Sequence, residues 1–293
     1  MTPDEVRTSV VLPVGERTSL LDSAVEAIRS QETPVGELLV VDDTPRGDLG
    51  EVDGARVLRS GGRGPYAARN VGWRAANGAL ILFVDVRSRP RPQWSRRVEA
   101  AFEDRDVAIA GSDVTILGGK SLGARASERQ QFYRLDKYNA NAFFRPYSPT
   151  CNLATRRTDL ELVDGFQEIR TGADADLCWR ILDLPGRRLE PIDEVLMDWV
   201  PRDTLRGYFE QNLRYGRSHW ALRHSWAHAG APQSTPMPHL LLARRIAGVA
   251  VRGALAAARR DDDAVLDELR KGGRFAYHVG YRLAADRARI ARN

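Results

Sequence analysis

Three short apolar runs, each ending at a proline or at carboxylates, constrain the fold of this chain more than any other feature. Residues 9–13 read Ser-Val-Val-Leu-Pro, residues 37–43 end in Val-Val-Asp-Asp, and residues 79–85 end in Phe-Val-Asp. Such runs are typical of buried strands, and a helical apolar pattern from about Thr18 separates the first run from the second. Strands joined by such a helix are parallel, and they bind ligands at their carboxyl ends. One edge of a parallel sheet is therefore expected to carry Pro13, Asp42, Asp43 and Asp85.

The rest of the chain predicts more strands and helices, with one clear linker. The three prolines between Ala231 and Pro238 mark that linker. We expect an α/β domain over residues 1–230, divided into two halves near residue 115, and a helical extension over residues 231–293. Further strands are expected at 55–58, 107–111 and 151–157, and further helices at 66–77, 94–102, 174–182, 205–224 and 240–260.

Composition indicates a soluble globular protein with an uneven charge distribution. The chain has 293 residues, of which 43% are hydrophobic and 28% charged, values ordinary for a folded domain. From Pro238 onward there are 12 basic and 6 acidic side chains, which leaves 32 and 33 for residues 1–237. The sequence pI of about 9.4 therefore describes the C-terminal extension and not the predicted α/β domain.

The two cysteines are too few for a disulfide framework and lack the spacing of a zinc site. Residues 1–6 show no apolar core of a signal peptide, and no apolar run is long enough to cross a membrane. We expect a cytoplasmic location, with contact at the inner face of the membrane as an alternative.

Seven segments between residue 9 and about residue 220 form one ordered pattern. They are Pro13; Val41 to Asp43; Ala68 to Gly72 with Gly78; Phe83 to Asp85; Asn152 to Arg157; Gly165 with Phe166; and Gly172 to Arg180. In order and spacing they resemble family 2 glycosyltransferases. The resemblance implies a GT-A fold, that is, a Rossmann-like mixed, mainly parallel sheet flanked by helices, with a nucleotide-sugar half up to about residue 115 and an acceptor half from about residue 116. It also implies a nucleotide-diphosphate sugar donor, expected to be a UDP-sugar, and hexosyl transfer with inversion at the anomeric carbon.

The resemblance also implies roles for individual residues. In that family the acids after the second strand hold the nucleoside, which places Asp42 and Asp43 against base and ribose, with Pro13 beside them. Arg69 would contact the base or the diphosphate. Asp85 matches the first acid of the Asp-x-Asp motif, which holds ribose and metal, and Asp174 matches the general base.

Physical chemistry supports the same role for Asp174 and offers an ordinary alternative. Displacement at an anomeric carbon needs a base for the acceptor hydroxyl and positive charge beside the departing diphosphate. A carboxylate at a helix start, as Asp174 would be, can act as that base. Alternatively, Asp174 caps the helix while Asp176 complements the helix dipole.

The chain departs from the family pattern at three positions around the expected metal. Arg87 replaces the second motif acid, Ala173 replaces a common glutamate, and Asp198 stands where a histidine is frequent. Arg87, helped by Arg89 or Arg91, would pair with diphosphate oxygens in place of the metal. Alternatively, Asp198 joins Asp85 in holding magnesium or manganese. A third interpretation is an inactive sugar-nucleotide-binding or scaffolding subunit, which remains the alternative to an enzyme.

The acceptor or diphosphate is expected to meet Asp176, Trp179 and Arg214. Trp179 would stack on a sugar ring, although tryptophan at this helical spacing is more often buried. Arg214 would touch diphosphate or pair with Glu210 on its own helix. A lipid-linked acceptor and a secondary metabolite both stay open.

Residues 240–260 contain no acid, and Arg245, Arg252 and Arg259 recur every seven residues. A basic amphipathic helix of this kind binds a membrane surface or docks on the catalytic domain, and both alternatives stay open. Nucleic-acid binding is disfavoured because no stacking aromatics alternate with the arginines. Gly61 to Gly64 lacks the Lys-Ser/Thr ending of a P-loop, and residues 13–17 lack the glycine-rich loop and lysine of nucleotidyltransferases.

Overall fold

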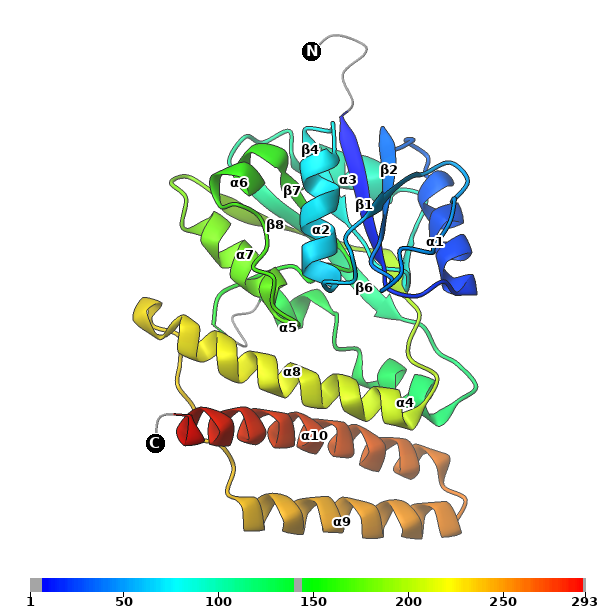
Figure 1. The fold of residues 1–293 in the computed structure, drawn as a ribbon. Coiled ribbons are helices and arrows are strands. Elements are labelled where there is room, and N and C mark those ends of the chain that lie inside the picture. Colours follow the sequence, from blue (N-terminus) through cyan, green and yellow to red (C-terminus); the bar gives the residue numbers. More distant parts are fainter. Residues whose placement is uncertain (1–6, 140–143, 292–293) are drawn as a thin grey trace. The chain divides into compact units, whose positions relative to one another are not determined.

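The computed structural model describes residues 7–139 and 144–291, which contain an eight-stranded sheet and the helices around it (Figure 1). The strands lie in the order β3-β2-β1-β4-β7-β6-β8-β5. Strands β3, β2, β1 and β4 are parallel, whereas β7 runs antiparallel to β4 and β6, and β5 antiparallel to β8. This confirms the mixed sheet flanked by helices. The strands are β1 (Thr8–Val14), β2 (Glu37–Asp42), β3 (Arg56–Arg59), β4 (Leu80–Phe83), β5 (Ser88–Pro90), β6 (Val107–Ile116), β7 (Leu153–Arg156) and β8 (Arg188–Trp199).

The chain forms two compact units. The first contains the residues up to Thr115 together with Tyr133–Val200, and the second contains Ile116–Phe132 together with Pro201 and all that follows. The predicted boundary after residue 230 thus falls inside the second unit. The helices of the first unit are α1 (Ser19–Arg29), α2 (Pro65–Ala75), α3 (Trp94–Ala101), α5 (Leu135–Asn139), α6 (Arg157–Leu162) and α7 (Ala173–Leu182). Those of the second are α4 (Leu122–Gln130), α8 (Leu205–Ser225), the 3₁₀ turn Ala227–Ala229, α9 (His239–Ala258) and α10 (Asp262–Ile290).

Helix α2 packs closely on the parallel strands because of Gly72. A side chain there would collide with Val11 of β1. On the same helix, the Asn70 amide donates to the carbonyl of Phe166 (2.8 Å) and accepts from its N–H (2.9 Å). Asn70 thereby ties α2 to the segment that leads into α7, so the two helices that carry Arg69 and Asp174 are held to one another.

Candidate active site

The predicted binding edge is the carboxyl end of the parallel strands. β1 pairs with β2 on one side and with β4 on the other, so the direction of strand addition reverses at β1. Ligands of open α/β sheets bind at this reversal. Pro13 is buried in β1 beside Val41, Asp42 ends the neighbouring strand β2, and Asp43 follows directly.

Asp42 organises the loop that follows β2. Its carboxylate accepts hydrogen bonds from the Thr44 N–H (2.8 Å), the Thr44 hydroxyl (2.7 Å) and the Leu49 N–H (3.0 Å). Burial raises its pKa, but these hydrogen bonds and the charge of Arg59 outweigh that effect and hold the pKa below its usual value. An ionised Asp42 therefore shapes residues 44–49, and its direct contact with a nucleoside stays a prediction.

Asp43 is half-buried and links the end of β2 to the start of α2. One carboxylate oxygen accepts from the Ser60 hydroxyl (2.6 Å) and from the Gly64 N–H (3.2 Å). Of the two acids, Asp43 is the more exposed and the better placed to meet a ligand.

The carboxylate of Asp85 is held from two directions just beyond β4. Its Oδ1 accepts from the Arg87 N–H (2.7 Å), and its Oδ2 accepts from the Trp199 indole N–H (3.2 Å). The indole thus connects Asp85 to the last residue of β8. Sequence reasoning did not identify Trp199, and no motif pointed to it.

Arg87 lies beside this pair. Its guanidinium donates to the carbonyl of Val200 (3.2 Å) and lies 5.8 Å from the centre of the Trp199 ring. The Arg89 guanidinium has partners on α1, because it donates to the carbonyl of Leu20 and the hydroxyl of Ser23. Of the three arginines proposed to replace the metal, Arg87 is the one held against Asp85 and Trp199.

Asp174 stands in the first turn of α7, after Gly172 with its positive φ of 94°. Its side chain is partly exposed and accepts a hydrogen bond from the Ala175 N–H (3.1 Å). The surrounding protein raises the pKa of Asp174 by desolvation, and the Ala175 N–H and the charge of Arg69 only partly offset this. A carboxylate with a raised pKa is a stronger base than an ordinary aspartate.

Tyr66 and Arg69 of α2 approach α7. The Tyr66 hydroxyl accepts a hydrogen bond from the Gly172 N–H (3.3 Å), and the Arg69 guanidinium lies 5.2 Å from the centre of the Tyr66 ring. Burial, together with the charge of Asp174, raises the pKa of Tyr66. Arg69 is 4% exposed, and its buried Nε has no hydrogen-bond partner among the described residues. A buried guanidinium N–H without a partner calls for an explanation, and a bound anion is one that fits its place beside Asp174. Tyr66 was not predicted, because a tyrosine in the first turn of a helix carries no motif.

The buried thiol of Cys151 is affected by the charges of Asp85, Asp174 and Arg69. Burial raises the pKa of its thiol, the charges of Asp85 and Asp174 raise it further, and the charge of Arg69 lowers it. Charges act strongly only at short range in a protein. The charges of Asp85 from the end of β4, Asp174 from α7 and Arg69 from α2 therefore all act on one buried side chain.

Two residues predicted to meet the acceptor have structural partners instead. Trp179 is 0% exposed, and its indole donates to the carbonyl of Arg145 (3.2 Å), so stacking on a sugar ring is contradicted. Asp176 is buried, and it accepts from Arg180 one turn later on α7 (2.9 Å). Arg214 belongs to α8 of the second unit, and its role stays a prediction.

The residues that the structure describes do not form a metal site of three or more protein ligands. Asp198 pairs with Arg91 through both its oxygens (2.8 and 3.3 Å). Because side chains alternate along a strand, it faces away from the side on which Trp199 reaches Asp85. In residues 7–139 and 144–291, no three His, Cys, Asp or Glu side chains are grouped so that they could hold a metal ion. The structure thus gives no support for Asp198 as a metal ligand.

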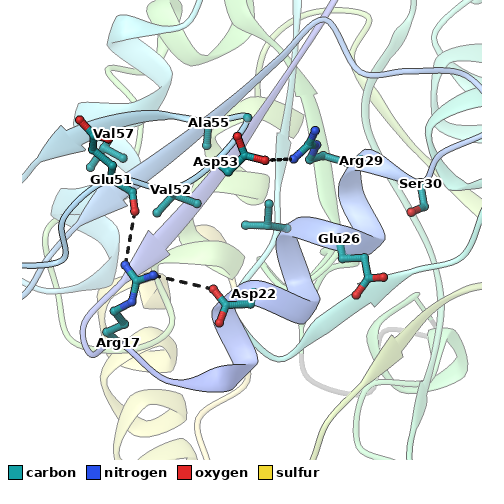
Figure 2. Close-up of a pocket in the computed structure, with 12 residues that line it drawn as sticks. Arg17, Asp22, Glu26, Arg29, Ser30, Glu51, Val52, Asp53, Ala55 and Val57 are labelled. Carbon is teal, nitrogen blue, oxygen red and sulfur yellow. Dashed lines mark hydrogen bonds and ion pairs between the residues drawn. The ribbon is translucent and has the colours of Figure 1, made fainter.

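A cavity of about 1030 Å³ lies elsewhere in the first unit, between α1 and residues 51–57 (Figure 2). Four of its charged side chains form two ion pairs: Arg29 with Asp53 at 2.7 Å, and Arg17 with Asp22 at 3.9 Å. The predicted site residues do not line it. Its size therefore does not make it the active site.

Comparisons with known proteins find a matching family model and several relatives. Residues 9–162 match the model of glycosyl transferase family 2. The pre-mycofactocin glycosyltransferase of Mycobacterium tuberculosis is 30% identical over 225 residues, which are 70% of this chain and 47% of that protein. The glycosyltransferase AglE of Haloferax volcanii is 27% identical over 187 residues, which are 60% of this chain and 61% of that protein. The chain thus spans about half to three fifths of the length of these relatives.

The fold is similar to that of a mannosyltransferase, PcManGT from Pyrobaculum calidifontis, solved in complex with GDP-Man and Mn²⁺. The match has a TM-score of 0.60 at 20% sequence identity and covers 94% of this chain and 86% of that one. At this identity the likeness shows the fold, which is the GT-A fold implied by the sequence motifs.

Proposed function

Since the chain belongs to glycosyl transferase family 2, we propose that it transfers a sugar from a nucleoside diphosphate sugar to an acceptor hydroxyl, with inversion at the anomeric carbon. The observation that carries this proposal is the environment of Asp174. Its carboxylate has a raised pKa at the start of α7, and it shares its surroundings with Asp85 and with the buried guanidinium of Arg69. A base and a cation near one another are what this displacement needs.

In the proposed reaction, Asp174 accepts the proton of the acceptor hydroxyl as its oxygen attacks the anomeric carbon. The bond between that carbon and the diphosphate oxygen breaks, and its electron pair leaves with the nucleoside diphosphate. Attack and departure on opposite faces of the sugar invert the anomeric centre. The proton on Asp174 then passes to water.

We assign the donor to the carboxyl ends of β1, β2 and β4. Asp43 would accept hydrogen bonds from the nucleoside, with Asp42 holding the loop beside it, and Asp85 would hold the ribose. Arg87 and the unpartnered Nε of Arg69 would meet the diphosphate. The donor base is proposed as uracil, and a thermal-shift comparison of UDP, GDP and dTDP tests it directly. The largest rise in the unfolding temperature is expected with UDP.

The divalent ion common in this family has no step in this proposal, because the residues present do not assemble its ligands. Arg87 takes over charge neutralisation at the diphosphate, as a guanidinium pairs well with phosphate oxygens. We expect turnover to persist in EDTA. Loss of turnover in EDTA with recovery in manganese would overturn this assignment of Arg87.

The decisive experiment replaces Asp174 by asparagine, which keeps the shape and removes the base. With an accepted donor and acceptor, kcat is expected to fall about 100-fold or more, while the Kd for the nucleotide stays within about twofold. Asp53→Asn is the matched control, because Asp53 is an exposed acid of the same unit in the cavity of Figure 2. It should leave kcat unchanged.

The outcomes separate the two functional interpretations. If the wild-type chain binds nucleotide but glycosylates no acceptor, and Asp174→Asn changes nothing, the chain is a sugar-nucleotide-binding or scaffolding subunit. A lipid-linked acceptor and a secondary metabolite both remain proposals. Transfer assays with a polyprenyl phosphate and with a phenolic glycoside acceptor distinguish them.

A further inference from the structure

Helix α9 of the second unit leaves a row of large apolar side chains in solvent. Leu240 is 84% exposed, Val251 60% and Leu255 51%. Their spacing places them on one face of the helix, together with Ala247, Ala254 and Ala258. We call this set the outer face of α9. Apolar side chains grouped on one exposed helix face, as opposed to scattered singly, indicate a binding surface.

The remaining side of α9 already has a partner. Leu242, Val249 and Ala256, which recur every seven residues, point toward α10, and Leu242 and Ala256 are buried. Figure 1 shows α10 between α8 and α9 within this unit. The sequence places five large apolar side chains on this helix beside its arginines, namely Leu241, Leu242, Ile246, Val249 and Leu255. The structure buries Leu242, whereas Leu241, Ile246 and Leu255 are exposed.

The charge around the outer face has a single sign. Residues 239–260 contain five arginines and no acid. Among the described residues, Arg252 alone of these five forms an ion pair, with Glu268 of α10. The nearest acids along the chain are engaged, because Asp262 pairs with Arg125, Asp263 pairs with Arg129, and Asp261 caps α10. Arg244 lies on the outer face, and Arg245, Arg259 and Arg260 lie beside it or at its end.

From this arrangement we infer that α9 lies flat on an anionic membrane surface, with its outer face among the acyl chains near the headgroups. The arginines would meet the lipid phosphates, and each contributes about a fivefold increase in binding near an anionic surface. A second copy of the same face is disfavoured, because it would bring two acid-free arginine sets together. In the part of the chain that the structure describes, no helix is long and apolar enough to cross a bilayer.

The test measures flotation of the full chain with vesicles, and it does not depend on the transfer reaction. We expect binding to vesicles of phosphatidylglycerol mixed with phosphatidylcholine, and at least tenfold weaker binding to pure phosphatidylcholine. The double variant Leu240→Ser/Val251→Ser should weaken binding at least tenfold. Arg244→Gln/Arg259→Gln should weaken it about 25-fold and make it less sensitive to salt.

Two matched controls keep the test specific. Leu162→Ser removes an apolar side chain that is 67% exposed on α6 of the first unit, and Arg206→Gln removes an exposed arginine on α8. Neither should change binding. Circular dichroism measures whether each variant is folded. If Leu240→Ser/Val251→Ser unfolds, the test rests on Arg244→Gln/Arg259→Gln alone.

Three results would overturn the inference. They are equal binding to the two kinds of vesicle, no binding to either, and binding that both double variants leave unchanged. A dimer in sedimentation velocity that Leu240→Ser/Val251→Ser dissociates would identify a second copy as the occupant instead.

Discussion

Helices α7 and α9 use the same kinds of side chain in opposite ways. Of the ten residues of α7, seven are buried, among them an aspartate and a tryptophan. Of the twenty residues of α9, two are buried, and its leucines, valine and arginines mostly face solvent. On α7, Asp176 pairs with Arg180, whereas most of the arginines on α9 form no ion pair with the described residues.

This difference predicts how each region responds to substitution. A charge in a protein interior interacts with a few fixed partners, so a single substitution there should have a large effect that salt hardly alters. Charges on an exposed face act together through water, so single changes should have small, additive and salt-sensitive effects. The same contrast applies to apolar side chains, which stabilise the fold only where the fold buries them.

The largest difference is expected between Trp179→Ala on α7 and Leu240→Ala on α9. Trp179 is fully enclosed, and Phe144 packs against its ring at 5.2 Å, so its loss should reduce the free energy of unfolding by about 3 to 5 kcal/mol. Leu240→Ala should change it by less than about 0.5 kcal/mol. Urea unfolding followed by fluorescence or circular dichroism measures both. Near-wild-type stability of Trp179→Ala would mean that its ring is not part of the core.

The next effect concerns the charge of Arg69 beside Asp174. Arg69 lowers the pKa of Asp174, so Arg69→Gln should raise that pKa further. The acidic limb of the kcat profile should then move to higher pH, because Asp174 becomes protonated at a higher pH. Activity at neutral pH should fall about 100-fold through the lost contact with the diphosphate.

Arg74→Gln on the same helix is the control for Arg69. Arg74 is half-exposed and pairs with Asp164, so its removal should leave the pH profile in place. An unchanged acidic limb in Arg69→Gln would separate Arg69 from the base and contradict the proposed site.

Glu268 is the exception within the second unit, because it is a buried acid that α9 and α10 share. Burial raises its pKa, but the hydrogen bonds from Arg252 and Lys271 outweigh this and hold the pKa below its usual value. A carboxyl group whose pKa is lower in the folded than in the unfolded state stabilises the fold at pH values above the unfolded-state pKa. This stabilisation is lost as the pH falls through the folded-state pKa. Glu268→Gln should therefore reduce the free energy of unfolding by about 2 kcal/mol at neutral pH.

The pH dependence provides the check on Glu268. Thermal unfolding of wild type and Glu268→Gln should differ clearly at pH 7, and the difference should shrink below about pH 4. A constant difference across this range would show that the carboxylate charge does not contribute. No such acid sensitivity is expected from the α9 arginines that have no acid nearby.

Sequence patterns were enough to predict the parallel strands and the positions of Asp42, Asp43, Asp85 and Asp174. A buried strand and the acid after it are local features, so periodicity finds them. The contact of Trp199 with Asp85 joins residues 114 positions apart and could not be read from the chain. The burial of Trp179 is likewise a tertiary property, since helical spacing alone suits both a core residue and a ligand contact.

The sequence predicted a helical extension over residues 231–293 but did not delimit α10 within it, for a physical reason. Glycines normally weaken a helix, and α10 contains Gly272, Gly273 and Gly280. In the structure, a side chain at Gly273 would collide with the Tyr208 hydroxyl, and one at Gly280 would collide with the backbone of Leu213. These glycines allow α10 to lie close against α8. Tertiary packing thus overrides a helix propensity that is unfavourable in isolation.

The smallest expected effect is that of Arg244→Gln on stability, and it sharpens the contrast with α7. Arg244 is exposed and pairs with no acid among the described residues, so the free energy of unfolding should change by less than about 0.5 kcal/mol. Arg252→Gln, on a different face of α9, removes the ion pair with the buried Glu268 and should reduce the free energy of unfolding by about 1 to 3 kcal/mol. Urea unfolding of both variants at low and high salt gives the comparison. A stability loss in Arg244→Gln as large as that in Arg252→Gln would mean that the outer face of α9 is covered by the protein itself, which would leave no surface for a membrane.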